Sequence, residues 1–157
     1  MAPARSNVSN DLVWQLTRNQ NAYLVRRNTG GGAQFSRDPL NLVNKQSFKY
    51  AGYANSKAIG IQGTDSGDLN VVTKKTSSPQ HPAKTFVTVT YGPKASIRKI
   101  YKGVADKTAK SGYRADLREE AVARVSAVRQ SQRPKKETPV KAPRGVKARK
   151  AAEKASE

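Results

Sequence analysis

Guanidinium groups are the side chains of this sequence best suited to chemistry, and they gather between residues 113 and 136. Arg114, Arg118, Arg124 and Arg129 flank an apolar stripe in this segment. A guanidinium group is planar and always charged, and it can donate two parallel hydrogen bonds to a phosphate. The pattern therefore predicts side chains that make phosphate and sugar contacts, although ordinary surface arginines on a solvated helix would show the same pattern.

A helix must position these arginines. Its apolar residues, at helical spacing, are Leu117, Ala121, Val125 and Val128. Asp116, Glu119 and Glu120 stand at its start, where the helix dipole favours negative charge. Pro134 cannot continue a helix and disfavours a helical residue before it. We therefore expect the helix to end near residue 133 and a basic tail to follow.

Other basic residues are candidate contacts as well. A second basic surface is predicted on a preceding helix, from Lys94, Arg98, Lys99 and Lys102. A third is predicted at the end of a strand, from Arg26 and Arg27. The remaining candidates are Arg18, Lys45, Lys49, Arg133, Lys135 and Lys136.

Catalytic and metal chemistry have few residues to draw on. The chain has no cysteine and a single histidine, His81, in a polar loop. Asp65 and Asp68 lack the spacing and the terminal glutamate of a calcium loop. Gly30 to Gly32 is not followed by the Lys-Ser or Lys-Thr of a phosphate-binding loop. We therefore expect a protein that is not an enzyme and has no cofactor, metal or small-molecule substrate.

The charge balance indicates a polyanionic partner. The 30 Lys and Arg exceed the 11 Asp and Glu, which gives a net charge of +19. Such an excess destabilises a compact state by self-repulsion unless a polyanion neutralises it. Nucleic acid is the commonest such partner, and an anionic membrane surface is the alternative. The sequence has no apolar run near the ~20 residues that span a bilayer, and no signal-peptide core near Met1.

Hydrophobic periodicity predicts a small α+β domain. A short helix over residues 9–18 comes first, and helices over 94–109 and about 113–133 come last. The strands are expected at 22–27, 48–53, 57–62, 69–76 and 85–91, with 57–62 as the hairpin partner of 48–53. We expect a mostly antiparallel sheet of about five strands. The predicted division is a flexible N-terminus (1–9), an RNA-binding domain (10–133) and a disordered basic tail (134–157).

Three blocks of the sequence resemble a known family. The first block has Leu12, Trp14, Arg18, Asn19, Tyr23, Leu24, Val25, Arg26, Arg27 and Asn28. The second has Asp38, Pro39, Asn41, Leu42, Ser47, Phe48, Lys49, Tyr50 and Gly52. The third has Tyr113, Arg114, Asp116, Leu117, Arg118, Arg124, Ser126, Ala127, Arg129, Ser131 and Gln132. Together they resemble family twenty-eight of the eukaryotic large-subunit ribosomal proteins. Ala115, where the family usually has proline, and the Gly30 to Gly32 insert depart from its pattern.

The resemblance implies an architectural, non-catalytic subunit of the eukaryotic large ribosomal subunit. Its implied partners are large-subunit ribosomal RNA and neighbouring ribosomal proteins, and its implied place is the cytoplasmic ribosome, reached through the nucleus and nucleolus. We expect no membrane partner and no homo-oligomer. The alternatives are a nucleolar ribosome-assembly factor built on a related domain and a basic chromatin or DNA-binding protein.

Overall fold

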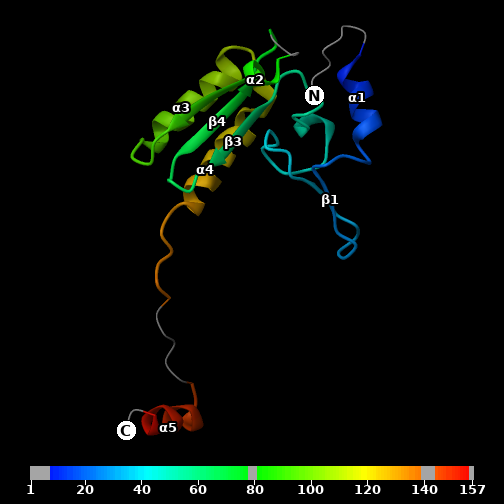
Figure 1. The fold of residues 1–157 in the computed structure, drawn as a ribbon. Coiled ribbons are helices and arrows are strands. Elements are labelled where there is room, and N and C mark those ends of the chain that lie inside the picture. Colours follow the sequence, from blue (N-terminus) through cyan, green and yellow to red (C-terminus); the bar gives the residue numbers. More distant parts are fainter. Residues whose placement is uncertain (1–7, 78–80, 139–143, 156–157) are drawn as a thin grey trace.

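The computed structural model describes residues 8–77, 81–138 and 144–155, and within them five antiparallel strands form two small sheets (Figure 1). In chain order, the strands are β1 (Leu24–Arg26), β2 (Gln34–Ser36), β3 (Ile59–Gly63), β4 (Leu69–Lys74) and β5 (Phe86–Tyr91). The α-helices are α1 (Asn10–Thr17), α2 (Pro82–Thr85), α3 (Ile97–Ala105), α4 (Arg118–Ser131) and α5 (Val146–Lys154). The α+β class is confirmed.

The larger sheet has the strand order β3-β4-β5, with both pairs antiparallel. Its strands are rich in β-branched residues, which suit a pleated surface. The β3–β4 turn is the TDSGD segment, where Thr64 N–H donates to Asp68 O at 3.0 Å. Gly67 in this turn has a φ of 83°, a backbone conformation that favours glycine.

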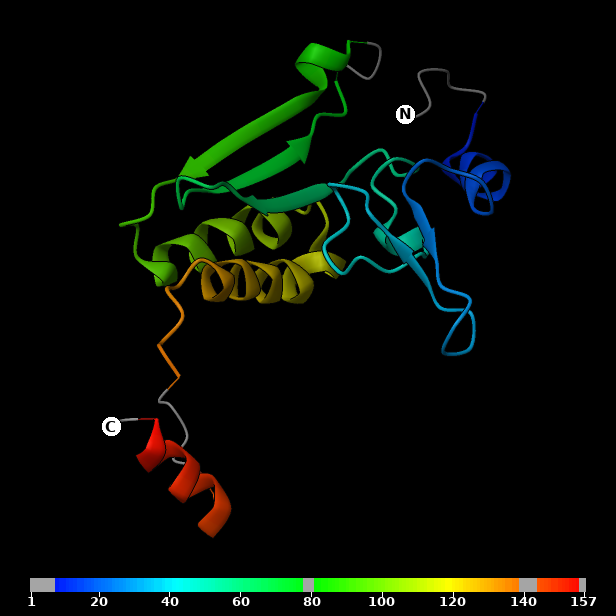
Figure 2. The ribbon, with the colours of Figure 1, turned by 60° about the horizontal axis from the view of Figure 1, so that its bottom comes forward.

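α3 and α4 lie side by side under one face of this sheet (Figure 2). The largest fully buried side chains of the core are Ile59, Ile61, Leu69, Val71, Ile100, Val104 and Val125. Burying each such side chain stabilises the fold by roughly 1.5–3 kcal/mol before the entropy of ordering is counted. The two helices are therefore fixed on the sheet by their apolar sides.

The N-terminal part, from α1 to the 3₁₀ turn at Phe48–Tyr50, forms a layer of its own around an aromatic cluster. Ser9 caps α1 by accepting a hydrogen bond from Leu12 N–H at 3.1 Å. The ring of Trp14 lies 6.0 Å from that of Phe48 and 6.3 Å from that of Tyr53. The predicted first helix is confirmed, and its tryptophan packs against two aromatic rings.

The predicted strand over residues 48–53 is wrong. Phe48–Tyr50 is a 3₁₀ turn, and β3 pairs with β4 instead of with this segment. Asn55 explains the difference, because its side-chain amide donates to Phe48 O at 2.7 Å and to Ala51 O at 2.9 Å. These carbonyls therefore have their hydrogen bonds without a neighbouring strand.

A strand also forms at residues 34–36, where none was predicted. β2 pairs with β1, with Val25 opposite Phe35. The glycines between them all have positive φ, at 74°, 82° and 72° for Gly30, Gly31 and Gly32. These glycines are thus at the tip of a hairpin that projects from the molecule (Figure 1).

The helices after the sheet begin later than predicted. The segment expected as one helix over 94–109 is α3, which begins at Ile97, followed directly by a π-helix over Asp106–Lys110. A 3₁₀ turn over Ala115–Leu117 precedes α4. α5 extends away from the domain within the predicted tail (Figures 1 and 2). Residues 1–7 and 139–143, parts of the predicted flexible termini, lie outside the described residues, and the division into domains stays a prediction.

Candidate nucleic-acid interface

α3 carries three exposed cations on the side that faces away from the core. Ile100 and Val104 are fully buried against the sheet and α4. Arg98, Lys99 and Lys102 lie on the opposite side of the same helix, because each residue turns it by about 100°, and all three are exposed. The burial of Ile100 and Val104 thus fixes the rotation of α3 and turns the three cations away from the core.

Two further lysines are exposed near the two ends of α3. Lys94, a predicted candidate, is exposed just before the helix. We call Lys94, Arg98, Lys99 and Lys102 the α3 basic surface. Lys110 is exposed at the end of the π-helix and was not among the predicted contacts. Its position eleven residues after Lys99, close to three helical turns, was the available signal.

The arginines of residues 113–136 do not form one exposed row. Arg118 is exposed at the start of α4, whereas Arg114, Arg124 and Arg129 are only partly exposed. The Nε atom of Arg124 is buried without a hydrogen-bond partner among the described residues. The structure therefore separates Arg118 from three arginines that pack against their own domain.

All three nitrogens of the Arg114 guanidinium donate hydrogen bonds within the protein. Its Nη1 donates to Lys57 O and its Nη2 to Lys49 O, each at 2.9 Å. Its Nε and Nη2 also donate to the two carboxylate oxygens of Asp116 at 2.8 Å. This pairing lowers the pKa of Asp116 below its usual value. Only 15% of the Arg114 side chain is exposed, so the guanidinium clamps two distant segments together.

Arg129 makes a similar clamp at the far end of α4. Its Nη1 donates to Gly67 O and its Nη2 to Gly92 O, both at 2.8 Å. These carbonyls belong to the β3–β4 turn and to the segment after β5. Gln132 supports the contact by donating to Asp68 O at 3.0 Å. Arg129 therefore ties the helix to both turns at one end of the sheet.

Lys49 is exposed but already has a carboxylate partner. Its Nζ lies 2.6 Å from Oε1 of Glu120 and 5.1 Å from the centre of the Tyr50 ring. The hydrogen bond with Glu120 raises the pKa of Lys49. The Tyr50 hydroxyl also donates to Glu120 at 3.0 Å. Glu120, predicted as a helix-terminal charge, thus joins α4 to the 3₁₀ turn at residues 48–50.

The other predicted cations lie on different parts of the surface. Arg18, Arg26, Arg27 and Lys45 are exposed in the N-terminal part. Arg26 donates from Nη2 to Asn19 O at 2.7 Å. The cations beyond α4 are also exposed, at Arg133, Lys135 and Lys136. Arg37 is exposed directly after β2, and it was not a predicted contact because the strand itself was not predicted.

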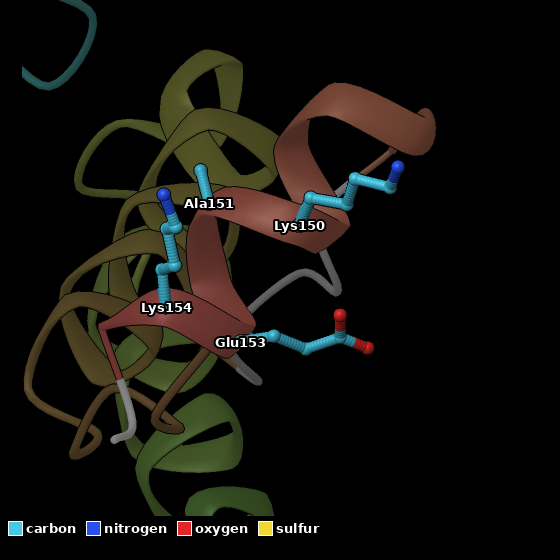
Figure 3. A pocket seen from close by; sticks show the side chains of 4 residues that line it. All are labelled: Lys150, Ala151, Glu153 and Lys154. Atoms are coloured by element: carbon cyan, nitrogen blue, oxygen red, sulfur yellow. The ribbon is translucent and has the colours of Figure 1, made fainter.

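The hollow shown in Figure 3 is lined by residues of α5 alone. Its side chains are Lys150, Ala151, Glu153 and Lys154, and they point in different directions from one helix (Figure 3). Within the described residues, no group of three or more His, Cys, Asp or Glu could hold a metal ion. No helix in the same part of the chain is long and apolar enough to cross a membrane.

The fold and its surface define a small, strongly basic α+β protein, in which a sheet and an aromatic cluster hold helices that present cations. The chain belongs to the Ribosomal L28e protein family, which matches residues 12–131. Members of this family are non-catalytic proteins of the eukaryotic large ribosomal subunit. This membership confirms the resemblance of the three sequence blocks.

Curated relatives agree with this assignment. Large ribosomal subunit protein eL28 of Schizosaccharomyces pombe is 43% identical over 131 residues, which are 83% of this chain and 97% of that protein. The protein of the same name from Caenorhabditis elegans is 38% identical over 60% of this chain and 74% of its own length. That of Dictyostelium discoideum is 32% identical over 80% and 90%.

Proposed function

We propose that this protein binds and stabilises folded large-subunit ribosomal RNA, chiefly through the α3 basic surface. The observation that carries this proposal is the position of Arg98, Lys99 and Lys102, which are exposed on a helix whose other side is fully buried. Rigid placement lowers the entropy lost when such side chains bind an anion. Family membership makes ribosomal RNA the polyanion that best fits them.

The predicted contacts fall into three groups in this proposal. Phosphate and sugar contacts come from the exposed cations: Arg18, Arg26, Arg27, Lys45, Lys94, Arg98, Lys99, Lys102, Arg118, Arg133, Lys135 and Lys136. Arg114 and Arg129 are only partly exposed and donate to carbonyls of distant segments, and Lys49 pairs with Glu120, so we assign these three first to holding the fold. Arg124 stays a predicted contact at the edge of α4.

The mode of recognition follows from the side chains available. Lysine and arginine on a helix surface neutralise phosphates and release counterions, without reading base sequence. The deep major groove of an RNA helix is closed to side chains, so its backbone and shape are read instead. We therefore propose that the protein recognises folded RNA by shape, with the basic tail along the adjoining RNA.

The proposed setting is the large subunit of the cytoplasmic ribosome, with assembly in the nucleus and nucleolus. The partners there are ribosomal RNA and neighbouring ribosomal proteins, and the chain acts as a single copy. Sedimentation tests this setting. The protein should travel stoichiometrically with mature large subunits, whereas presence only in precursor particles would favour an assembly factor.

Salt dependence of RNA binding tests the mechanism. We expect the affinity of the full chain for large-subunit RNA to fall steeply as salt rises. The double variant Arg98→Ala, Lys102→Ala should reduce the slope of log affinity against log salt by about two, since about one counterion is released per phosphate contact. Filter binding over a salt series measures the slope.

A matched double variant controls for net charge. Lys75→Ala with Lys84→Ala removes the same two charges from exposed positions near the other end of the sheet. Its slope should stay close to that of the wild type. A nearly flat salt dependence of the wild type would contradict RNA binding itself. Equal losses in both double variants would show that net charge acts, and not the α3 basic surface.

A further inference from the structure

β5 is an edge strand. The order of the larger sheet is β3-β4-β5, so β5 pairs with β4 along one side only. α3 and α4 cover the face of the sheet that carries Ile61 and Val71, and the other edge of β5 lies apart from them (Figure 2). Among the described residues, the outer edge of β5 has no neighbouring strand.

The register shows which backbone groups face outward. Lys75 N–H donates to Thr85 O at 2.7 Å, and the Thr73 hydroxyl donates to Val87 O at 3.4 Å. In an antiparallel pair, alternate residues direct both their N–H and C=O groups to the partner strand. Val87 and Val89 therefore face β4, whereas the N–H and C=O of Thr88 and its alternate neighbours point away from the sheet.

The side chains of this strand are uncharged. The sequence FVTVTY has no Lys, Arg, Asp, Glu or Pro, in a chain with 30 Lys and Arg. Exposed edge strands are usually protected by such residues, because free backbone groups invite pairing with another chain. Phe86 is 46% exposed on this strand, and Thr88 and Thr90 are exposed too. An edge kept free of protecting charges is suited to being paired.

The face of the sheet next to this edge is also poor in free charge. Its exposed or partly exposed side chains on β3 and β4 are Gln62, Asn70 and Val72. Lys74 shares this face, but it is 5% exposed, and its Nζ donates to Gly52 O at 3.0 Å and to Asn55 O at 2.9 Å. These side chains therefore offer no free cation that could bind a phosphate, whereas the α3 basic surface offers several.

We propose that the outer edge of β5 pairs with an extended segment of a neighbouring ribosomal protein, which adds a fourth strand to the sheet. The inference rests on the proposed place of the chain in the large subunit. Only a polypeptide backbone offers alternating N–H and C=O groups at the spacing of a strand. An apolar side chain of that segment would cover Phe86. A second copy of this chain is disfavoured as the occupant, because two chains of net charge +19 repel each other.

Thr88→Pro tests the pairing. Proline removes the N–H that points outward and leaves the β4–β5 hydrogen bonds intact, so the free protein should melt near the wild-type temperature. In cells that make both forms, the variant should be incorporated into large subunits roughly fivefold less well than the wild type, for the loss of about one hydrogen bond. Thr88→Lys, which places a charge on the same edge, should act in the same direction.

Two controls separate this inference from the proposed function. Val89→Pro removes an N–H that faces β4, so it should lower the melting temperature where Thr88→Pro does not. RNA affinity measured by filter binding should be unchanged in Thr88→Pro, since no cation is altered. Equal incorporation of variant and wild type would overturn the pairing while leaving the proposed RNA binding by α3 untouched. Loss of RNA affinity in Thr88→Pro would instead place this edge against RNA, and would also overturn the pairing.

Cross-linking identifies the occupant. A photoreactive benzoylphenylalanine replaces Phe86 in assembled large subunits, where a fourth strand would bring side chains within about 5.5 Å. The expected product is a covalent link to a segment of another ribosomal protein, resistant to ribonuclease. A link to RNA, a link to a second copy of this chain, or no link at all would each contradict the proposal.

Discussion

At the scale of single residues, charge in this protein has two uses. Arg98 and Lys102 are exposed and have no carboxylate beside them among the described ion pairs. Arg114 and Arg129 have the same charge, but their guanidinium groups donate hydrogen bonds to main-chain carbonyls of the protein itself. A guanidinium group suits both uses, because its five donors can meet either phosphate oxygens or peptide oxygens.

Substitution of Arg114 distinguishes the two uses. Arg114→Lys keeps the charge but loses the forked hydrogen bonds to Asp116, Lys57 and Lys49. We expect it to lower the free energy of unfolding by about 2 kcal/mol, in the range of hydrogen bonds to charged groups. Urea titration measures this change, and Arg118→Lys, at an exposed position, serves as the control. Weaker RNA binding with unchanged stability would instead place Arg114 in the interface.

The Arg114–Asp116 pair also makes stability depend on pH. The hydrogen bond from Arg114 lowers the pKa of Asp116 from its ordinary value of 3.8. The stabilisation is therefore fully present above about pH 4 to 5 and is lost as the pH falls through the lowered value. Asp116→Asn should melt lower at pH 7 and lose less on acidification to pH 3. Melting curves followed by circular dichroism test this, and parallel pH profiles for both proteins would contradict it.

At the scale of elements, most helices and strands could be predicted, whereas β2 and the 3₁₀ turn at residues 48–50 could not. The stripe of Ile97, Ile100 and Val104 specifies α3, and alternation specifies β4 and β5. The aromatic residues Phe48 and Tyr50 alternate in the same way without forming a strand. The Phe48 carbonyl accepts from Asn55, 7 residues further on, and the Tyr50 hydroxyl donates to Glu120, 70 residues further on. The alternation of the two aromatic residues contains neither partner.

The candidate site shows the same limit. Exposure of the α3 basic surface follows from the helix period and was predictable. The clamping role of Arg129 depends on turns more than thirty residues away, so its spacing on α4 alone gave no sign of it. Lys74 was also not predicted as a special residue, because a lysine in a β-rich segment is usually exposed. In the structure its ammonium group donates to the carbonyls of Gly52 and Asn55, and burial lowers its pKa.

Contact between the two layers depends on a glycine in β3. Gly60 faces the loop before the 3₁₀ turn, and a Cβ built there would overlap the carbonyl oxygen of Pro39 and crowd Leu40. Gly60→Ala should therefore destabilise the protein by roughly 1–3 kcal/mol, as overpacking does. Thermal unfolding measures the loss. Gly112→Ala does not serve as a control, because Gly112 has a φ of 60°, at which alanine is itself strained. An unchanged melting temperature for Gly60→Ala would show that the layers can move apart.

At the scale of the whole molecule, the domain and the tail differ in how they are stabilised. The tail helix α5 carries no buried residue among its described side chains and stands apart from the sheet (Figure 1). Deletion of residues 134–157 should therefore leave the melting temperature of the domain nearly unchanged, while RNA affinity falls because basic side chains are removed. Calorimetry measures the first effect. Loss of cooperative melting would show that the domain extends past residue 133.

The aromatic cluster gives the N-terminal layer its own optical reporter. Trp14 is the single tryptophan of the chain, and its ring contacts only the rings of Phe48 and Tyr53 among the described aromatic pairs. Its fluorescence therefore senses this layer alone, whereas the far-ultraviolet signal comes mainly from the sheet and its two covering helices. Coincident transitions in the two signals mean that the protein melts as one cooperative unit, and separate transitions mean that the tryptophan layer can detach first.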